Sequence, residues 1–226
     1  MSKTDRELAE NHRYKWLDGT PLTNVTAIAE CLDPGDKAGR MAGAAAKIAA
    51  AGGNYRAEWN AKRDTGTRVH GYAEAFLAGQ SAEVTAGDEG YADALEKFLT
   101  AESIEPVEVE AILLSRHGYG GRCDLFAKMA ATPALLDFKT GGCYPTALTL
   151  QLAAYRYADG IAVYHPTGKL DTVRDVPKVD LTAGVYLHAD GTYTIREVAA
   201  DEAAFAHFVN LLAAHRWAKA IEKEKP

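Results

Sequence analysis

Asp137 and Lys139 are the two residues of this chain whose spacing most directly suggests chemistry. They end the apolar segment ALLDFK (134–139), and a pair of glycines follows shortly after. In a β-strand, residues two apart point to the same face, about 7 Å from each other. The segment therefore predicts a strand that projects Asp137 and Lys139 together and directs Phe138 to the opposite, core side.

A second carboxylate comes from the segment RCDLFAKM (122–129), which is typical of the strand that returns to pair with ALLDFK. Hairpin pairing would bring Asp124 alongside Asp137. Carboxylates on neighbouring strands repel each other unless a cation lies between them, and hard oxygen ligands suit Mg²⁺ or Mn²⁺. One or two such ions would polarise a phosphate and lower the pKa of a bound water. Lys139 would hold that water or stabilise the charge on the phosphorane.

Further residues are candidates for the same site. Glu110 lies on the predicted strand VEVEAILLS (107–115) and could join the cluster, and Glu108 has the same parity. Gln151 and Tyr155 are one helical turn apart and share a face, where they could bind phosphate oxygens or brace the lysine. His70, on a predicted helix, could complete the coordination of a divalent ion as a neutral imidazole.

Each of these patterns also has an ordinary structural interpretation. An Asp-x-Lys pair is usually a solvated strand face or a salt bridge, and a lone helical histidine is more often structural than a ligand. The GYGG segment (118–121) lacks the spacing of a phosphate-binding loop and predicts a turn. The apolar run before Asp137 favours the functional interpretation, because sites in α/β proteins form at strand ends. Glycines after Lys139 allow close approach by a ligand.

The first half of the chain predicts mostly helices. Residues 12–22 indicate a hairpin around Asp18-Gly19, and a short helix follows with Thr23 as its cap. We expect a helix rich in Ala and Gly at 37–51, two helical segments at 54–64 and 65–78 with Thr65 capping the second, and a helix at 88–100.

The second half predicts strands at 107–115, 122–129 and 134–139, a helix at 146–159, a strand at 161–165 and a charged, proline-bearing loop. A hairpin at 183–198 and a helix from about residue 201 follow. We expect a single α/β domain over 1–226. A mainly helical part, 1–104, carries His70 and covers a mixed sheet, and a core at 105–226 has the order β-β-β-α-β-β-α.

Composition sets further limits. The net charge of −6 has the wrong overall sign for a nucleic-acid binder, although bound Mg²⁺ would offset catalytic carboxylates. No apolar run approaches the roughly 18–20 residues of a membrane span, and the N-terminus has no apolar signal-peptide core, so we predict a cytoplasmic protein without a membrane partner. The three cysteines, Cys31, Cys123 and Cys143, lack C-x-x-C spacing, which argues against a disulfide framework or a zinc site.

Taken in order, the motifs resemble those of a known family. They are GTRVH with His70, a strand bearing a glutamate, GRCD with Asp124, LDFKTG with Asp137 and Lys139, and QLAAY with Gln151 and Tyr155. This set is similar to the RecB-like branch of the PD-(D/E)XK nuclease superfamily, over about residues 12–160. The segment GTPLTNVTAIAECL also looks like the opening of small phage-encoded exonucleases of that branch.

The resemblance implies a restriction-endonuclease-like fold and a role for each matched residue. His70, Asp124, Asp137 and the backbone carbonyl of Phe138 would be metal ligands, with Glu110 as a less certain one. Asp124, Asp137 and Lys139 would be catalytic, and Gln151 and Tyr155 would be accessory or DNA-binding residues. Some relatives carry four cysteines for an iron–sulfur cluster, most of them near the C-terminus. This chain has no cysteine after Cys143, so no cluster is expected.

The leading functional hypothesis is a metal-dependent DNA exonuclease of phage or prophage origin, acting in the host cytoplasm during recombination or replication. Its partner would be DNA, together with a recombinase, a single-strand-binding protein or a helicase. Two alternatives stay open: a catalytically inactive nuclease fold that binds DNA or a protein partner, and a structure-specific endonuclease.

Overall fold

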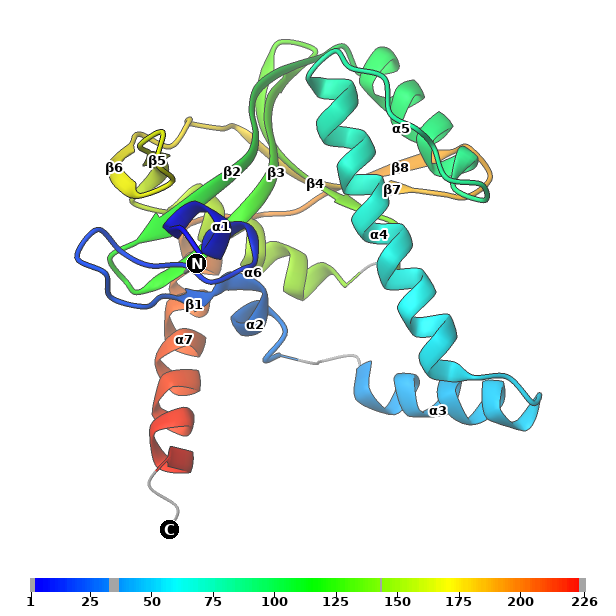
Figure 1. Ribbon diagram of the computed structural model, residues 1–226, viewed down its shortest axis with the longest axis horizontal. Helices are drawn as coiled ribbons and strands as arrows, with labels where there is room; N and C mark the ends of the chain where they lie inside the picture. The colour runs from blue at the N-terminus through cyan, green and yellow to red at the C-terminus, as the bar shows by residue number, and fades with distance from the viewer. Residues whose placement is uncertain (1–2, 33–36, 143, 224–226) are drawn as a thin grey trace.

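The computed structural model describes residues 3–32, 37–142 and 144–223, and its centre is a mixed sheet of eight strands (Figure 1). Along the sheet the order is β6-β5-β2-β3-β4-β7-β8, and β1 pairs with β3. The strands are β1 (Thr23–Asn24), β2 (Ile104–Ser115), β3 (Tyr119–Met129), β4 (Thr132–Lys139), β5 (Gly160–Tyr164), β6 (Leu170–Arg174), β7 (Leu181–Leu187) and β8 (Tyr193–Glu197).

Three long central strands hold the sheet together. The β2, β3 and β4 segments form an antiparallel meander, and β7 then adds to β4 in parallel, with Asp137 opposite Gly184. Only two residue pairs join β2 to β5, at Leu113–Ile161 and Leu114–Gly160. The sheet is therefore mixed, and it opens between the rest of β2 and the β5–β6 hairpin.

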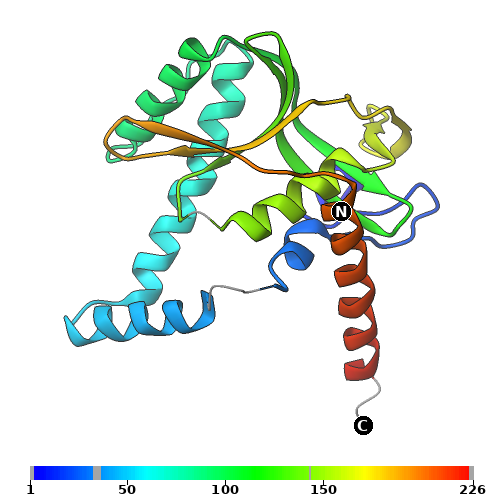
Figure 2. The same ribbon diagram turned by 180° about the vertical axis from the view of Figure 1, so that it is seen from behind.

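Helices cover both faces of this sheet. Within the described residues the helices are α1 (Asp5–Glu10), α2 (Val25–Ala29), α3 (Lys37–Ala50), α4 (Tyr55–Leu77), α5 (Glu89–Ala101), α6 (Pro145–Arg156) and α7 (Glu202–Lys223). One face packs α2, α6 and α7 through a core that includes Leu135, Leu152 and Phe208. The other packs α4 and α5 through Leu136, Phe98 and Phe138. Figure 2, seen from behind, shows the same two layers.

Alternating residues of β4 divide between the two cores, as the strand period predicts. Leu135 belongs to the core under α6, whereas Leu136 and Phe138 belong to the core under α5. Phe138 is only 1% exposed. The prediction that Phe138 points into the core while its neighbours share the opposite face is confirmed.

The α/β class, the mixed sheet with flanking helices and the N-terminal helices are confirmed, but several local predictions were wrong. Residues 55–77 form one helix, whose start Asn54 caps by accepting from the backbone N–H groups of Arg56 and Ala57. Thr65 therefore lies inside α4 and caps nothing. The cap of α2 is Asn24 and not Thr23.

The strand count was also too low. Four strands separate α6 from α7: the predicted strand at 161–165 corresponds to β5, the predicted hairpin at 183–198 to β7 and β8, and residues of the expected loop form β6. Most of the GYGG segment belongs to β3 and is not a turn. A β-carbon at Gly120 would lie 2.7 Å from Cβ of Tyr14, and one at Gly121 would lie 2.5 Å from Cε1 of Tyr155. Both glycines therefore serve close packing within a strand.

Three remaining expectations concern the N-terminal hairpin, the cysteines and membrane-spanning helices. The hairpin at 12–22 is present, with an antiparallel bridge between Lys15 and Pro21. Cys31 and Cys123 are free thiols, and Cys143 lies outside the described residues. Within the described parts of the chain, no helix is long and apolar enough to cross a membrane.

Candidate metal centre

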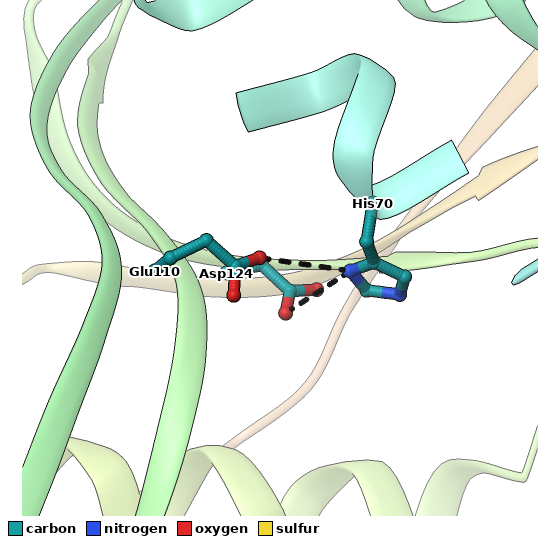
Figure 3. Close-up of side chains that lie close together, drawn as sticks. All are labelled: His70, Glu110 and Asp124. Atoms are coloured by element: carbon teal, nitrogen blue, oxygen red, sulfur yellow. Dashed lines mark ion pairs between the residues drawn. The ribbon is translucent and has the colours of Figure 1, made fainter. Parts of the chain in front are cut away.

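Three side chains from three different elements converge on one point. His70 comes from α4, Glu110 from β2 and Asp124 from β3, and each offers one ligand atom within 4.8 Å of the others. His70 Nδ1 lies 3.4 Å from Asp124 Oδ1 and 3.9 Å from Glu110 Oε1 (Figure 3). One imidazole nitrogen and two carboxylate oxygens at this spacing could hold a metal ion.

The backbone fixes both carboxylates. Asp124 Oδ2 accepts a 2.7 Å hydrogen bond from the backbone N–H of Phe138, which leaves Oδ1 directed at His70. Glu110 lies opposite Asp124 between the paired residues Val109–Leu125 and Ala111–Cys123, yet its φ is +52°. A non-glycine residue in this region costs about 1–2 kcal/mol, and strain of this kind collects at functional sites.

Asp88 fixes the helix that carries His70. Its carboxylate accepts from Arg68 at 2.6 and 3.1 Å and from the Tyr72 hydroxyl at 3.1 Å. Arg68 and Tyr72 flank His70 by two residues on either side in α4. Although Asp88 occupies the N-cap position of α5, its side chain makes no capping hydrogen bond. It holds α4 against the start of α5 instead, and so sets the height of His70 above the sheet.

Asp137 and Lys139 form an ion pair beside this group. Lys139 Nζ contacts Asp137 Oδ2, and Gln151 Nε2 donates to Asp137 Oδ1 at 2.9 Å. The same amide nitrogen lies 3.3 Å from the hydroxyl oxygen of Tyr155. Asp137 is 1% exposed, so its charge depends on these partners. Asp137 contacts Lys139 and Gln151, whereas the three-residue group consists of His70, Glu110 and Asp124.

Burial and the charges of neighbouring side chains shift the pKa values of His70, Glu110 and Lys139. The negative charge of Asp124 raises the pKa of His70 to about 9, against the effect of burial. Burial, reinforced by Asp124, raises the pKa of Glu110 to about 7. Burial opposes the charge on Lys139, but the neighbouring Asp137 and Asp124 outweigh it and raise its pKa, so the lysine is a cation at neutral pH.

Arg122 is a member of the centre that sequence reasoning missed. Its Nε lies 2.6 Å from Glu110 Oε2, on the far side of that carboxylate from His70. Both residues line a polar cavity of about 560 Å³ between β2 and β5, where the sheet opens. Its three arginines each pair with a carboxylate: Arg6 with Glu10, Arg122 with Glu110, and Arg174 with Glu108. The arginines of the cavity are thus all paired, and Glu74 adds a fourth carboxylate to its lining.

The predicted side chains therefore lie in or beside the metal centre. They form two adjoining sets, a division that the sequence did not indicate. His70, Asp124 and the less certain Glu110 form the possible metal group, and Asp137, Lys139, Gln151 and Tyr155 form the adjoining hydrogen-bonded set. Ligation by Asp137 and by the carbonyl of Phe138 stays a prediction.

Two of the missed residues had recognisable signals. Arg122 lies two residues before Asp124, on a predicted strand. Gly121 precedes it in a glycine pair whose composition predicts a turn, although the structure places it in β3. Asp88 gave no local signal, since its partner lies twenty residues earlier.

Compared with protein-family models and with curated proteins, the chain matches neither a family nor an individual relative.

Proposed function

We propose that this protein is a metal-dependent deoxyribonuclease of the PD-(D/E)XK type, most plainly an exonuclease. The observation that carries the proposal is the convergence of His70, Glu110 and Asp124 within 4.8 Å, beside the ion pair that buried Asp137 makes with Lys139. Carboxylates and an imidazole that hold a hard cation, with a lysine next to them, are the groups that phosphodiester hydrolysis requires.

Each residue has a role that follows from its contacts. His70, Glu110 and Asp124 would hold the cation, with Asp124 fixed by the Phe138 N–H. When bound, the cation would polarise the scissile phosphate and acidify a water. Lys139 places a positive charge where negative charge develops on the phosphate. Asp137 directs Lys139 through their ion pair.

Gln151 and Tyr155 complete this arrangement from α6. The Gln151 amide fixes the Asp137 carboxylate by hydrogen bonding, and the Tyr155 ring packs against the backbone of Gly121. Their role in the proposal is to hold Asp137, and through it Lys139, in place. This role is narrower than direct DNA binding, because both side chains are turned toward protein partners.

Degradation of linear DNA in the presence of Mg²⁺ or Mn²⁺ tests the proposal. We expect hydrolysis by the wild type, none with EDTA, and a loss of at least about 100-fold in Lys139→Ala, the scale of losing one charge-stabilising group. Equal activity of Lys139→Ala and wild type would refute the mechanism. Covalently closed circular DNA separates the two enzyme classes, since only an endonuclease cuts it.

Calorimetry with Mn²⁺ separates the nuclease from an inactive fold that only binds DNA. The enzyme should take up the ion, and Asp124→Asn should weaken that uptake. A protein that binds DNA but takes up no divalent ion would support the binding-only alternative.

A further inference from the structure

The segment 37–64, named here the arm, stands apart from the two layers that cover the sheet. It comprises α3 and the first ten residues of α4, and both views show it projecting away from the sheet (Figures 1 and 2). Every residue from 49 to 64 is exposed. The second half of α4 is different, since Val69, Tyr72 and Ala73 are buried against the sheet. One helix thus joins the candidate metal centre to an exposed extension.

One face of α4 runs continuously along this extension to His70. Tyr55, Trp59, Lys62, Gly66 and His70 fall within an arc of about 80° at 3.6 residues per turn. They span roughly 22 Å along the axis. A β-carbon at Gly66 would lie 3.5 Å from Oγ1 of Thr140, the residue after Lys139. The face therefore looks onto the end of β4 and then onto the metal group.

The exposed part of this face combines aromatic rings with a cation. Tyr55 and Trp59 are 42% and 41% exposed, although rings of this size are usually more buried. They are four residues apart and so lie next to each other on the helix. Lys62 follows one turn later and is also exposed. Two adjacent rings and a cation are the elements with which proteins stack bases and neutralise phosphates of single strands.

The charge of the arm supports a polyanionic partner. Residues 37–64 contain six Lys and Arg residues and two Asp and Glu residues, in a chain whose net charge is −6. Positive charge is thus concentrated here against the overall balance. The cavity between β2 and β5 does not compete for such a partner, because each of its arginines is already paired with a carboxylate.

We propose that the arm binds single-stranded DNA and guides it along the Tyr55–Trp59–Lys62 face toward the metal group. The inference rests on the proposed function for what happens at the end of the track, but not for the binding itself. A single strand is the expected partner because its bases expose their faces to the rings, whereas a duplex hides them in its stack. The arm thus assigns a substrate class to the site, namely DNA that is single-stranded from the start or whose two strands separate before one of them reaches His70.

Binding to a fluorescein-labelled oligothymidylate, followed by fluorescence anisotropy in EDTA, tests the inference without any cleavage. Loss of one base-stacking ring should weaken binding in Trp59→Ala by about 5- to 140-fold. Trp217→Ala is the matched control, because Trp217 is a 69% exposed tryptophan on α7. We expect it to bind as the wild type does.

A second variant keeps the test independent of the tryptophan. Lys62→Gln/Arg63→Gln should reduce the slope of log K against log salt concentration by about 1.4, or about 0.7 for each lost cation. Lys219→Gln/Lys223→Gln on α7 is the charge-matched control and should leave the slope unchanged. Circular dichroism and thermal unfolding establish that the variants are folded.

Three results would overturn the inference: no measurable binding of the oligothymidylate, equal effects of the arm and α7 variants, or a duplex that binds as tightly as the single strand. Because the assay contains no metal, its outcome is separate from that of the proposed function. Arm-dependent binding by a protein without nuclease activity would support the role of the arm in binding single-stranded DNA and refute the proposed deoxyribonuclease activity. Metal-dependent cleavage, together with arm variants that bind normally, would support the proposed deoxyribonuclease activity and refute the role of the arm.

Discussion

The left-handed backbone at Glu110 makes a sharp prediction about stability. Glu110→Ala and Glu110→Gly remove the same carboxylate and the same contact with Arg122. They differ in the backbone, because alanine at a φ of +52° costs about 1–2 kcal/mol and glycine does not. Glycine in a strand loses about 0.5–1 kcal/mol more conformational entropy than alanine. The net advantage of Glu110→Gly is therefore about 1 kcal/mol.

Urea unfolding in EDTA measures this difference, and thermal unfolding should show a midpoint about 2–4 °C higher for Glu110→Gly in a chain of this size. Glu108 provides the matched control on the same strand, since it does not have a positive φ. There the order should reverse, and Glu108→Gly should be about 0.5–1 kcal/mol less stable than Glu108→Ala. If alanine is as stable as glycine at position 110, the backbone is not strained and Glu110 loses its strongest sign of a functional role.

Three further predictions follow from the surroundings of the site. Lys139→Met should keep Mn²⁺ binding in calorimetry while DNA hydrolysis falls by at least about 100-fold, and a parallel loss of metal binding would contradict its separate role. Gly121→Ala should destabilise the fold by about 1–3 kcal/mol in urea, because its methyl group would overlap the ring of Tyr155; an unchanged stability would mean that the ring moves freely. Asp88→Asn should cost about 1.5–3 kcal/mol at neutral pH. Its neighbour Arg68 lowers the pKa of Asp88 below 3.8, so the carboxylate stabilises the fold above that value, and the difference from wild type should shrink as pH falls through the folded-state pKa. A difference that does not change with pH would count against the ion pair.

Short-range periodicity explains most of what the sequence predicted correctly. A period of two placed Asp137 and Lys139 on one face of β4 and Phe138 in the opposite core, and their ion pair follows from it. A helical period placed Gln151 and Tyr155 on the same face of α6, where their polar groups meet. These relations involve residues within four positions of each other, so local geometry determines them.

Relations between distant elements could not be predicted in the same way. The clasp between Asp88 and Arg68 joins two helices, and it uses an aspartate that by local rules should cap α5. Glycines 120 and 121 indicate a turn by composition, and only the packing of Tyr14 and Tyr155 on the two faces explains them in a strand. The positive φ of Glu110 likewise arises from the assembled sheet, because glutamate has no local preference for it.

The three carboxylates of the centre need positively charged partners, and the contacts show which cation each of them faces. Removing a carboxylate from water costs several kcal/mol unless a partner replaces the lost solvation. Glu110 faces Arg122, Asp124 faces His70, and Asp137 faces Lys139. Two of these partners, Arg122 and Lys139, cannot ligate a metal as cations. His70 can once it gives up its proton to become a neutral imidazole, and its Nδ1 lies near both carboxylates of its group. In the proposed nuclease, Asp137 therefore orients Lys139, while Asp124 and Glu110 hold the ion with His70. The catalytic lysine and the metal ligands are thus separate members of one cluster of charged side chains.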